Sequence, residues 1–247
     1  MERIVDTHCH VLAEVDDGAQ SIEEMRQMLQ MAYDEGIRYI IATPHHHPRR
    51  GRKPPRELRK QLKVAREEAA KISDKFRVYL GTEIYFGQDI PEKLREGKIL
   101  TMNKTRFVLV EFSHSDTFEY ICQGIQQIQM KGYEVILAHI ERYPCMYKDI
   151  GNAEHLKHMG VRIQVNADSI TGENGWKRFV KQLLEHRLVF CVGTDAHSPK
   201  GRPPRMRKAA EYVEKKYGEE YARRIFFSNA RIMLRKKKKD ESGQSNT

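Results

Sequence analysis

Apolar runs with the character of β-strands recur along this chain, and polar residues follow each run closely. The run at residues 108–110, for example, is followed by Glu111, and the run at residues 189–192 is soon followed by Asp195. The seven runs begin near Ile4, Tyr39, Val78, Val108, Val135, Ile163 and Val189. Because parallel strands of a barrel bring their carboxyl ends to one face, we expect the polar residues after these runs to converge there.

Helical patterns separate the apolar runs. Ser21 and Glu24 form a capping box at the start of one predicted helix, and Gly36 stands where that helix is expected to end. Further helices are predicted at residues 55–72, 117–131, 154–159, 176–185, 206–216 and 219–227. Alternating strands and helices favour a parallel sheet covered by helices, and 247 residues fit one seven-stranded α/β barrel. We predict one domain at residues 1–235, followed by a disordered basic and polar tail at residues 236–247.

Composition indicates a folded protein of a reducing compartment. Hydrophobic residues make up 39% of the chain and charged residues 32%, which is ordinary for a globular domain. No apolar stretch approaches the roughly 20 residues that span a bilayer, and no secretion signal is apparent. The four cysteines are far apart, which predicts neither a zinc finger nor a disulfide framework. We therefore expect a cytoplasmic location.

The formal net charge of +10 is concentrated in two basic runs, at residues 49–53 and 235–239. This clustering weakens a nucleic-acid interpretation, and we expect no nucleic-acid partner. For the second run a solvated terminus is favoured over weak contact with an anionic surface. The first run follows three consecutive histidines. Two interpretations of it are equally favoured: a loop that steers an anionic substrate toward the site, and a loop that is merely solvated.

Two pairs of candidate ligands, one near each end of the chain, predict a metal site. His8 and His10 alternate along a strand, so both point to the same face and can chelate one cation. Asp6 shares that face and is expected to accept a proton from a ligating imidazole. Asp195 and His197 repeat the spacing after another apolar run, which strengthens the metal interpretation.

Taken singly, the other candidates have plainer explanations. Asp17 stands in an Asp-Asp-Gly sequence typical of a turn, His45 could belong to a polar loop, and Glu83 or Glu111 could form salt bridges at a barrel rim. The whole set of nine candidate ligands changes this balance: His8, His10, Asp17, His45, Glu83, Glu111, His139, Asp195 and His197. One catalytic metal uses about three protein ligands, so the set predicts two or three metals, as suits in-line displacement at phosphorus. Imidazole and carboxylate ligands fit Mn²⁺, Fe or Zn, with Mn²⁺ favoured.

Two arginines add a phosphate-binding interpretation. Arg142 lies three residues beyond His139, and Arg202 lies seven beyond Asp195. A guanidinium group binds phosphate oxygens in a fork and stays charged at any working pH. A surface position is the alternative for each arginine in so basic a chain. No cysteine is followed by arginine at the sixth position, which excludes the Cys-x5-Arg loop of cysteine-based phosphatases.

The motifs resemble those of the PHP (polymerase and histidinol phosphatase) superfamily. They are Asp-Thr-His-Cys-His (6–10), Thr-Pro-His (43–45), Gly-Thr-Glu (81–83) and Thr-Asp-Ala-His (194–197). Within it the chain is similar to the bacterial manganese-dependent protein-tyrosine phosphatases of capsule and exopolysaccharide gene clusters. This closer similarity rests on residues 15–19, 81–85, 108–112, 137–143, 164–167, 193–197 and 201–204. Only the lysine tail and the unusually basic loop at residues 48–55 depart from it.

The resemblance implies a distorted seven-stranded TIM-like β/α barrel of the PHP type with three metals. By position, the first metal would be held by His8, His10, Glu83 and Asp195. Glu83 would bridge to a second metal that Glu111 and His139 complete. The third would be held by Asp17, His45 and His197, while Arg142 and Arg202 would bind the phosphate. The implied partner is an autophosphorylating bacterial tyrosine kinase that controls polysaccharide synthesis.

The resulting hypothesis is hydrolysis of phosphotyrosine, in which a hydroxide bridging two metals attacks phosphorus in line. Asp17 and His45 are both candidates for the general acid. The first alternative is a PHP phosphoesterase that acts on small phosphomonoesters such as histidinol phosphate. An amidohydrolase, and a non-catalytic module that binds polyanions through the basic segments, are further alternatives.

Overall fold

The computed structural model describes residues 3–172 and 176–234. The predicted tail at residues 236–247 lies outside the described residues, and the single domain at residues 1–235 stays a prediction. No helix in the described part of the chain has the length and apolar character needed to cross a bilayer.

Ten strands are present in the described residues. They are β1 (Ile4–Cys9), β2 (Ile37–Ala42), β3 (His45–His47), β4 (Gly51–Arg52), β5 (Arg77–Leu80), β6 (Glu83–Tyr85), β7 (Phe107–Glu111), β8 (Glu134–Leu137), β9 (Arg162–Asn166) and β10 (Val189–Gly193). They form a three-stranded sheet of order β1-β2-β5 and a seven-stranded sheet of order β10-β9-β8-β7-β6-β3-β4. All pairings are parallel except that of β3 with β4. The mixed α/β fold with parallel strands is therefore as expected.

The predicted number of seven strands is wrong, because two of the predicted runs are each split into two strands. β2 gives way to β3 at Thr43 and Pro44, and β5 gives way to β6 at Gly81 and Thr82. Pro44 has no N–H to donate to a ladder, and a Cβ at Gly81 would lie 2.5 Å from Met102 Sδ. At both breaks the chain passes from the smaller sheet to the larger one. β4 is an addition that the sequence pattern did not predict.

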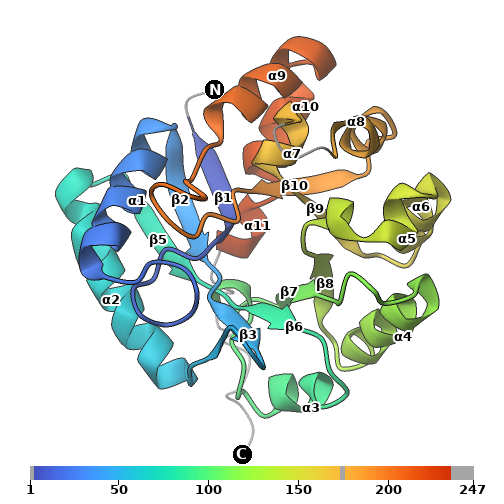
Figure 1. Ribbon diagram of the computed structural model, residues 1–247, viewed down its shortest axis with the longest axis horizontal. Coiled ribbons are helices and arrows are strands. Elements are labelled where there is room, and N and C mark those ends of the chain that lie inside the picture. The colour runs from blue at the N-terminus through green and yellow to red at the C-terminus, as the bar shows by residue number, and fades with distance from the viewer. Residues whose placement is uncertain (1–2, 173–175, 235–247) are drawn as a thin grey trace, which may run out of the picture.

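Helices surround the strands, as Figure 1 shows. They are α1 (Ile22–Asp34), α2 (Pro55–Ile72), α3 (Ile90–Arg95), α4 (Phe118–Gln129), α5 (Pro144–Tyr147), α6 (Ile150–His158), α7 (Ala167–Thr171), α8 (Lys177–Glu185), α9 (Arg207–Tyr217), α10 (Glu219–Arg223) and α11 (Arg231–Leu234). Short 3₁₀ turns occur at Met102–Lys104 and Ile140–Arg142, and a π-helical turn at Arg224–Ser228 continues α10. Ser21 caps α1 as predicted, since its side chain accepts a hydrogen bond from the Glu24 N–H. The short helices α3, α5, α7 and α11 were not predicted.

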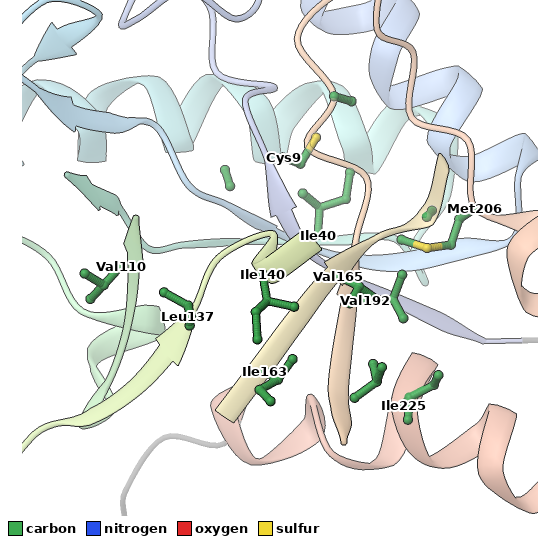
Figure 2. Packing of buried hydrophobic residues seen from close by; sticks show 14 of the residues in the cluster. Cys9, Ile40, Val110, Leu137, Ile140, Ile163, Val165, Val192, Met206 and Ile225 are labelled. Atoms are coloured by element: carbon green, nitrogen blue, oxygen red, sulfur yellow. The ribbon is translucent and has the colours of Figure 1, made fainter. Parts of the chain in front are cut away.

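The hydrophobic core has two parts. The larger part fills the space between strands and helices, where Leu137, Ile163 and Ile225 pack among many other buried residues (Figure 2). The smaller part lies among the strands themselves and is closed by residues near the end of the described chain. It consists of Val5, Ile41, Met102, Phe107, Leu109, Ile136, Ala138, Cys191, Ala230 and Met233. The apolar positions of the strands therefore form the core, and the polar residues that follow the strands are left at one end.

The two sheets meet where β1 and β10 end. Asp195 N–H donates to the His8 carbonyl at 2.7 Å, and His10 N–H donates to the Ala196 carbonyl at 2.9 Å. These bonds join the first strand to the last at the end where the polar residues gather.

Candidate metal centre

All nine predicted ligands come together at one end of the strands, near the carboxyl ends of β1, β2, β5, β7, β8 and β10. β1 carries His8 and leads to His10, while β3 begins at His45 and β6 at Glu83. Glu111 ends β7, and the others follow strands or stand in the loop after β1: Asp17, His139, Asp195 and His197. Every one of them is buried except Asp17, whose side chain is 47% exposed. Residues from across the whole sequence thus meet in one polar cluster.

The four residues assigned to the first metal lie at distances suited to a shared cation. His8 Nε2 is 3.2 Å from Glu83 Oε1 and 3.4 Å from Asp195 Oδ1. His10 Nε2 is 3.3 Å from Glu83 Oε2, 3.5 Å from Asp195 Oδ1 and 3.1 Å from His8 Nε2. Ligand atoms roughly 2.1 Å from one ion stand about 3 to 3.5 Å apart, so this group fits one cation.

Glu83 extends the cluster toward Glu111 and His139. His139 Nε2 lies 2.9 Å from Glu83 Oε1 and 3.7 Å from Glu111 Oε2. His45 Nδ1 also approaches this pair, at 2.9 Å from Glu83 Oε2 and 3.5 Å from Glu111 Oε1. Glu83 therefore lies between the first group and a second one, where the bridging assignment requires it.

The third group of candidate ligands is centred on Asp17. Its Oδ1 lies 3.2 Å from His45 Nε2 and 3.5 Å from His197 Nε2. His10 stands close to the same group, with its ring centroid 4.0 Å from that of His197 and 4.3 Å from that of His45. His10 therefore connects the first and third groups in addition to its predicted place in the first.

The cluster contains buried polar atoms that find no hydrogen-bond partner among the described residues. They include both ring nitrogens of His45, Glu83 Oε2, Glu111 Oε1 and His197 Nε2. His45 Nδ1 and Glu83 Oε2 are 2.9 Å apart and still do not form a well-aligned hydrogen bond. Unpaired buried polar atoms are costly, and imidazole and carboxylate atoms are metal ligands. The residues present therefore fit bound divalent cations.

Charge pairing keeps the buried carboxylates ionised. Burial raises the pKa of Glu83, but the His8 and His45 side chains hold it well below its usual value. Burial likewise raises the pKa of Asp195, while His8, Arg142 and Arg202 hold it well below the usual value. Ionised carboxylates are the form that binds metal.

Asp16 is a functional candidate that the sequence analysis missed. Its Oδ2 lies 2.8 Å from His10 Nδ1 and accepts the His45 N–H at 2.9 Å. Its Oδ1 accepts the Gly18 N–H at 3.0 Å. Asp16 therefore orients two predicted ligands, the role that had been expected of Asp6.

The expected role of Asp6 is wrong. Its carboxylate accepts hydrogen bonds from the Thr194 hydroxyl at 2.5 Å and from the backbone N–H groups of Thr194 and His8. It therefore joins β1 to the segment after β10 and bonds to no imidazole. Two residues along a strand advance about 6.6 Å, which leaves Asp6 below the level of the histidine rings.

β9 contributes two further residues that support the ligands. Gln164 Oε1 accepts the His139 N–H at 2.7 Å and lies 3.3 Å from His8 Nδ1. Gln164 Nε2 donates to Asn166 Oδ1, whose amide in turn donates to Asp195 Oδ2 at 3.1 Å. This strand end was assigned no ligand, and its residues connect three ligands by hydrogen bonds instead.

Backbone shape also matters at the cluster. A Cβ at Gly18 would lie 2.2 Å from the His10 carbonyl oxygen, so only glycine allows the 15–18 loop to approach His10 this closely. His139 and Asp195 both have positive φ, at 33° and 52°. Non-glycine residues rarely adopt this conformation, and it is found preferentially at functional sites.

Both predicted arginines point into the cluster. Arg142 Nη2 lies 2.7 Å from Asp195 Oδ2, and Arg202 Nη2 lies 2.5 Å from the same oxygen. Asp195 Oδ1 faces His8 and His10, so its two oxygens contact different partners. A single carboxylate thus joins the candidate metal centre to two guanidinium groups at its edge.

Aromatic side chains stand around the same edge. The His47 ring packs edge-on against Tyr85 at 4.4 Å between centroids, and His114 packs edge-on against Tyr143 at 6.1 Å. His46 stands between His45 and His47. Burial, and then the charge of Arg52, lowers the pKa of His46 to about 4. Of the three consecutive histidines, His45 belongs to the cluster and His47 to its edge.

Comparison with known proteins agrees with this architecture. Tyrosine-protein phosphatase CpsB of Streptococcus pneumoniae is 33% identical over 238 residues, which cover 94% of this chain and 98% of that protein. Tyrosine-protein phosphatase YwqE of Bacillus subtilis is 31% identical, with 94% of this chain and 92% of that protein covered. The fold also matches a solved structure from a study of YwqE and CpsB, described as unique metal-dependent tyrosine phosphatases. That match has a TM-score of 0.82 and 31% identity, and covers 89% of this chain and 90% of the other.

The match extends from the first strand to the end of the described chain. Residues 4–235 fit the model of the family described as capsular polysaccharide synthesis, CpsB/CapC. The resemblance found in the sequence motifs is thereby confirmed. This chain belongs to the CpsB/CapC family of capsular polysaccharide synthesis.

Proposed function

We propose that this protein is a metal-dependent hydrolase that removes phosphate from phosphotyrosine in proteins. The observation that carries the proposal is Asp195, which faces two histidines with one oxygen and two arginines with the other. A metal centre next to two guanidinium groups is suited to a phosphate monoester. Its relatives that are named tyrosine-protein phosphatases support phosphotyrosine as the ester.

We further propose the three-metal assignment by residue. His8, His10, Glu83 and Asp195 would hold the first metal, Glu83, Glu111 and His139 the second, and Asp17, His45 and His197 the third. Mn²⁺ is the favoured metal because carboxylates contribute four of the nine ligands, with Fe or Zn as alternatives. When bound, the metals supply Lewis acidity that activates water and neutralises phosphate charge.

The chain's own residues would bind and orient the substrate. Arg142 and Arg202 stabilise the non-bridging phosphate oxygens, because a guanidinium donates two parallel hydrogen bonds to such a group. The aromatic edge formed by His47, Tyr85 and His114 is suited to receive the phenyl ring. Burial lowers the pKa of His114, and the charges of His139 and Arg142 lower it further, which supports its position near the phosphate.

Asp17 and His45, both assigned to the third metal, stay the two candidates for the general acid. Burial lowers the pKa of His45, but the carboxylates of Glu83 and Asp17 raise it to about 12. Burial raises the pKa of Asp17, while the hydrogen bonds from His197 and His45 hold it far below its usual value. A phenolate with a pKa of about 10 also leaves with little assistance.

The same proposal extends to the partner protein, the cellular location and the type of barrel. A phosphotyrosine protein of capsule or exopolysaccharide synthesis, such as an autophosphorylating tyrosine kinase, is the proposed partner. A cytoplasmic location is supported by the four free cysteines. The parallel strands, joined where β1 and β10 end, are proposed to form one distorted barrel of the PHP type.

Turnover by metal-loaded protein tests the substrate. Phosphotyrosine peptides and histidinol phosphate are compared side by side with Mn²⁺, Fe²⁺ and Zn²⁺, and bound metal is counted on the same preparation. We expect a higher kcat/KM for the peptides. Preference for histidinol phosphate would favour the small-ester alternative.

The double variant His10→Ala, Asp195→Ala serves to test the site. It is expected to lose bound metal and activity together. Full activity in this variant would contradict the metal-enzyme proposal.

A further inference from the structure

A short basic hairpin adjoins the candidate metal centre. β3 and β4 pair antiparallel, with His46 opposite Arg52 and His47 opposite Gly51, so the connecting residues 48–50 form its tip. The Arg49 N–H donates to His47 Nδ1 at 2.9 Å, which fixes the start of the tip. The same hairpin begins at His45, so it carries a predicted metal ligand at one end and two arginines at the other.

The hairpin rests on the loop that carries Asp16 and Asp17. A Cβ at Gly51 would lie 3.0 Å from both Asp16 Cβ and the Val15 carbonyl oxygen. Gly51 also has a φ of 143°, where side chains are rarely tolerated. Because Gly51 has no side chain, the hairpin can contact the 15–18 loop closely. This contact holds the tip of the hairpin beside the site.

A shallow cleft of about 780 Å³, widely open to solvent, lies between the hairpin and the loop. Its lining residues are Glu14, Val15, Asp16, Asp17, Gln20, Arg49, Arg50 and Lys53. Because Asp17 belongs to both this cleft and the third metal group, the cleft is continuous with the candidate active site.

Some of the charged side chains that line the cleft have ion-pair or hydrogen-bond partners, and others do not. Asp16 is hydrogen bonded to His10, and Asp17 contacts His45 and His197, so both carboxylates are directed toward the metal centre. Lys53 lies 3.6 Å from Glu57.

The remaining charges of the lining favour a positive cleft. Arg49 and Arg50 are exposed, and neither side chain has a hydrogen bond or ion pair within the described parts of the chain. Glu14 is also exposed and is the one lining carboxylate there without a partner. Two guanidinium groups therefore face one opposing carboxylate.

Arg50 also acts on the mouth of the site. Burial lowers the pKa of both His47 and His114, and the charge of Arg50 lowers each further. Arg50 itself lines the cleft, so its charge is felt both there and at these two histidines of the aromatic edge.

We propose that Arg49 and Arg50 make this cleft a binding site for acidic side chains that flank the phosphotyrosine of a protein substrate. Because Asp17 belongs to both the cleft and the third metal group, residues close to the phosphotyrosine in the substrate's sequence are the ones expected to reach the cleft. The inference rests on the proposed function and assigns a substrate class to it: acidic phosphotyrosine segments. Exposed ion pairs contribute modestly, so the effect is selectivity among substrates rather than a requirement for turnover.

Matched peptides test this selectivity. Two phosphotyrosine peptides of equal length carry two flanking Glu residues or two flanking Gln residues, and kcat/KM is measured with metal-loaded protein at low ionic strength. We expect about a fivefold preference for the acidic peptide, which falls as salt is added. The variant Arg49→Gln, Arg50→Gln should lose this preference and still hydrolyse phenyl phosphate at the wild-type rate.

Two further variants control for net charge. Arg178→Gln with Arg223→Gln removes two positive charges from α8 and α10, which lie away from the hairpin (Figure 1), and should keep the preference. Glu14→Gln removes the opposing carboxylate and should increase it. Equal kcat/KM for both peptides in the wild type, or equal loss of preference in both double-arginine variants, would overturn the inference. If no phosphotyrosine peptide is hydrolysed with any metal, the proposed function itself fails.

Discussion

Several single residues at the metal centre contact more than one other residue, and Asp16 is the clearest example. It contacts the His10 ring with one oxygen, which also accepts the His45 backbone N–H. Carboxylates that bond to a ligating imidazole fix its orientation and tautomer, and their loss typically costs about 10- to 100-fold in metal affinity. We expect Asp16→Asn to weaken metal binding by such a factor, measured by competition with a chelator. Asp34→Asn, at an exposed position of α1, is the control. Unchanged affinity in Asp16→Asn would contradict the assigned role.

Arg142 is expected to bind the phosphate through the planar shape of its guanidinium group as well as through its charge. Lysine keeps the charge but cannot donate two parallel hydrogen bonds to one phosphate. We predict that Arg142→Lys lowers kcat at least about tenfold while the number of bound metals stays the same. Steady-state kinetics combined with metal analysis checks this, with Arg178→Lys as the control. A kcat equal to that of the wild type would mean that Arg142 does not bind the phosphate.

The sequence predicted the ligands better than their supporting residues. His8 and His10 could be found because alternation along a strand directs both side chains to one face. Asp16 could not, because Asp-Asp-Gly indicates a turn equally well and its partner His45 lies 29 residues away. Asp6 was misassigned because strand periodicity gives the face but not the depth at which a side chain lies.

Among the helices, α1 and α2 are tied together by a charged contact. Arg26 Nε lies 2.8 Å from Glu68 Oε2, and Lys71 lies 2.7 Å from Glu68 Oε1. The hydrogen bond from Arg26, followed by that from Lys71, lowers the pKa of Glu68 from 4.5 to about 2. Both cations are substantially exposed, so screening by solvent keeps the contribution to the free energy of unfolding small.

This contact predicts a dependence of stability on pH. Because the pKa of Glu68 is lower in the folded state, its contribution is complete above about pH 4.5 and is lost as the pH falls toward 2. We expect Glu68→Gln to destabilise the protein at pH 7 and to have progressively less effect below pH 4.5. Denaturant unfolding of both proteins across this range measures the difference. A difference that does not change with pH would show that the ion pair is not its cause.

The limits of α1 and α2 were easier to predict than the breaks between strands, for a physical reason. The limits of α1 and α2 depend on local signals, a Ser cap with Glu24 and a proline at the first turn. The breaks after β2 and β5 depend on which sheet each segment joins, and that is decided by distant strands. β4 depends on contact between Gly51 and the 15–18 loop, which the sequence of the hairpin alone does not reveal.

For the molecule as a whole, bound metal should contribute to stability. Ligands from both ends of the chain meet in one cluster, so a metal that binds only the folded state stabilises the entire fold. At a free concentration 100 times its Kd, one metal adds about 2.7 kcal/mol, which corresponds to roughly 5 to 10 °C in Tm. We predict such an increase when Mn²⁺ is added to metal-free protein, measured by thermal unfolding. The variant His10→Ala, Asp195→Ala should show little response, and an equal increase in it would place the stabilising metal elsewhere.

The shared oxygen of Asp195 has a consequence for affinity. Arg142 and Arg202 already contact an anion of the protein itself, so an arriving phosphate exchanges with a carboxylate. The net gain is the difference between two similar ion pairs, which is small compared with either pair alone. The released inorganic phosphate faces the same competition, so the site is expected to hold its product weakly. Tight recognition must then come from the rest of the substrate, its aromatic ring and the residues beside it.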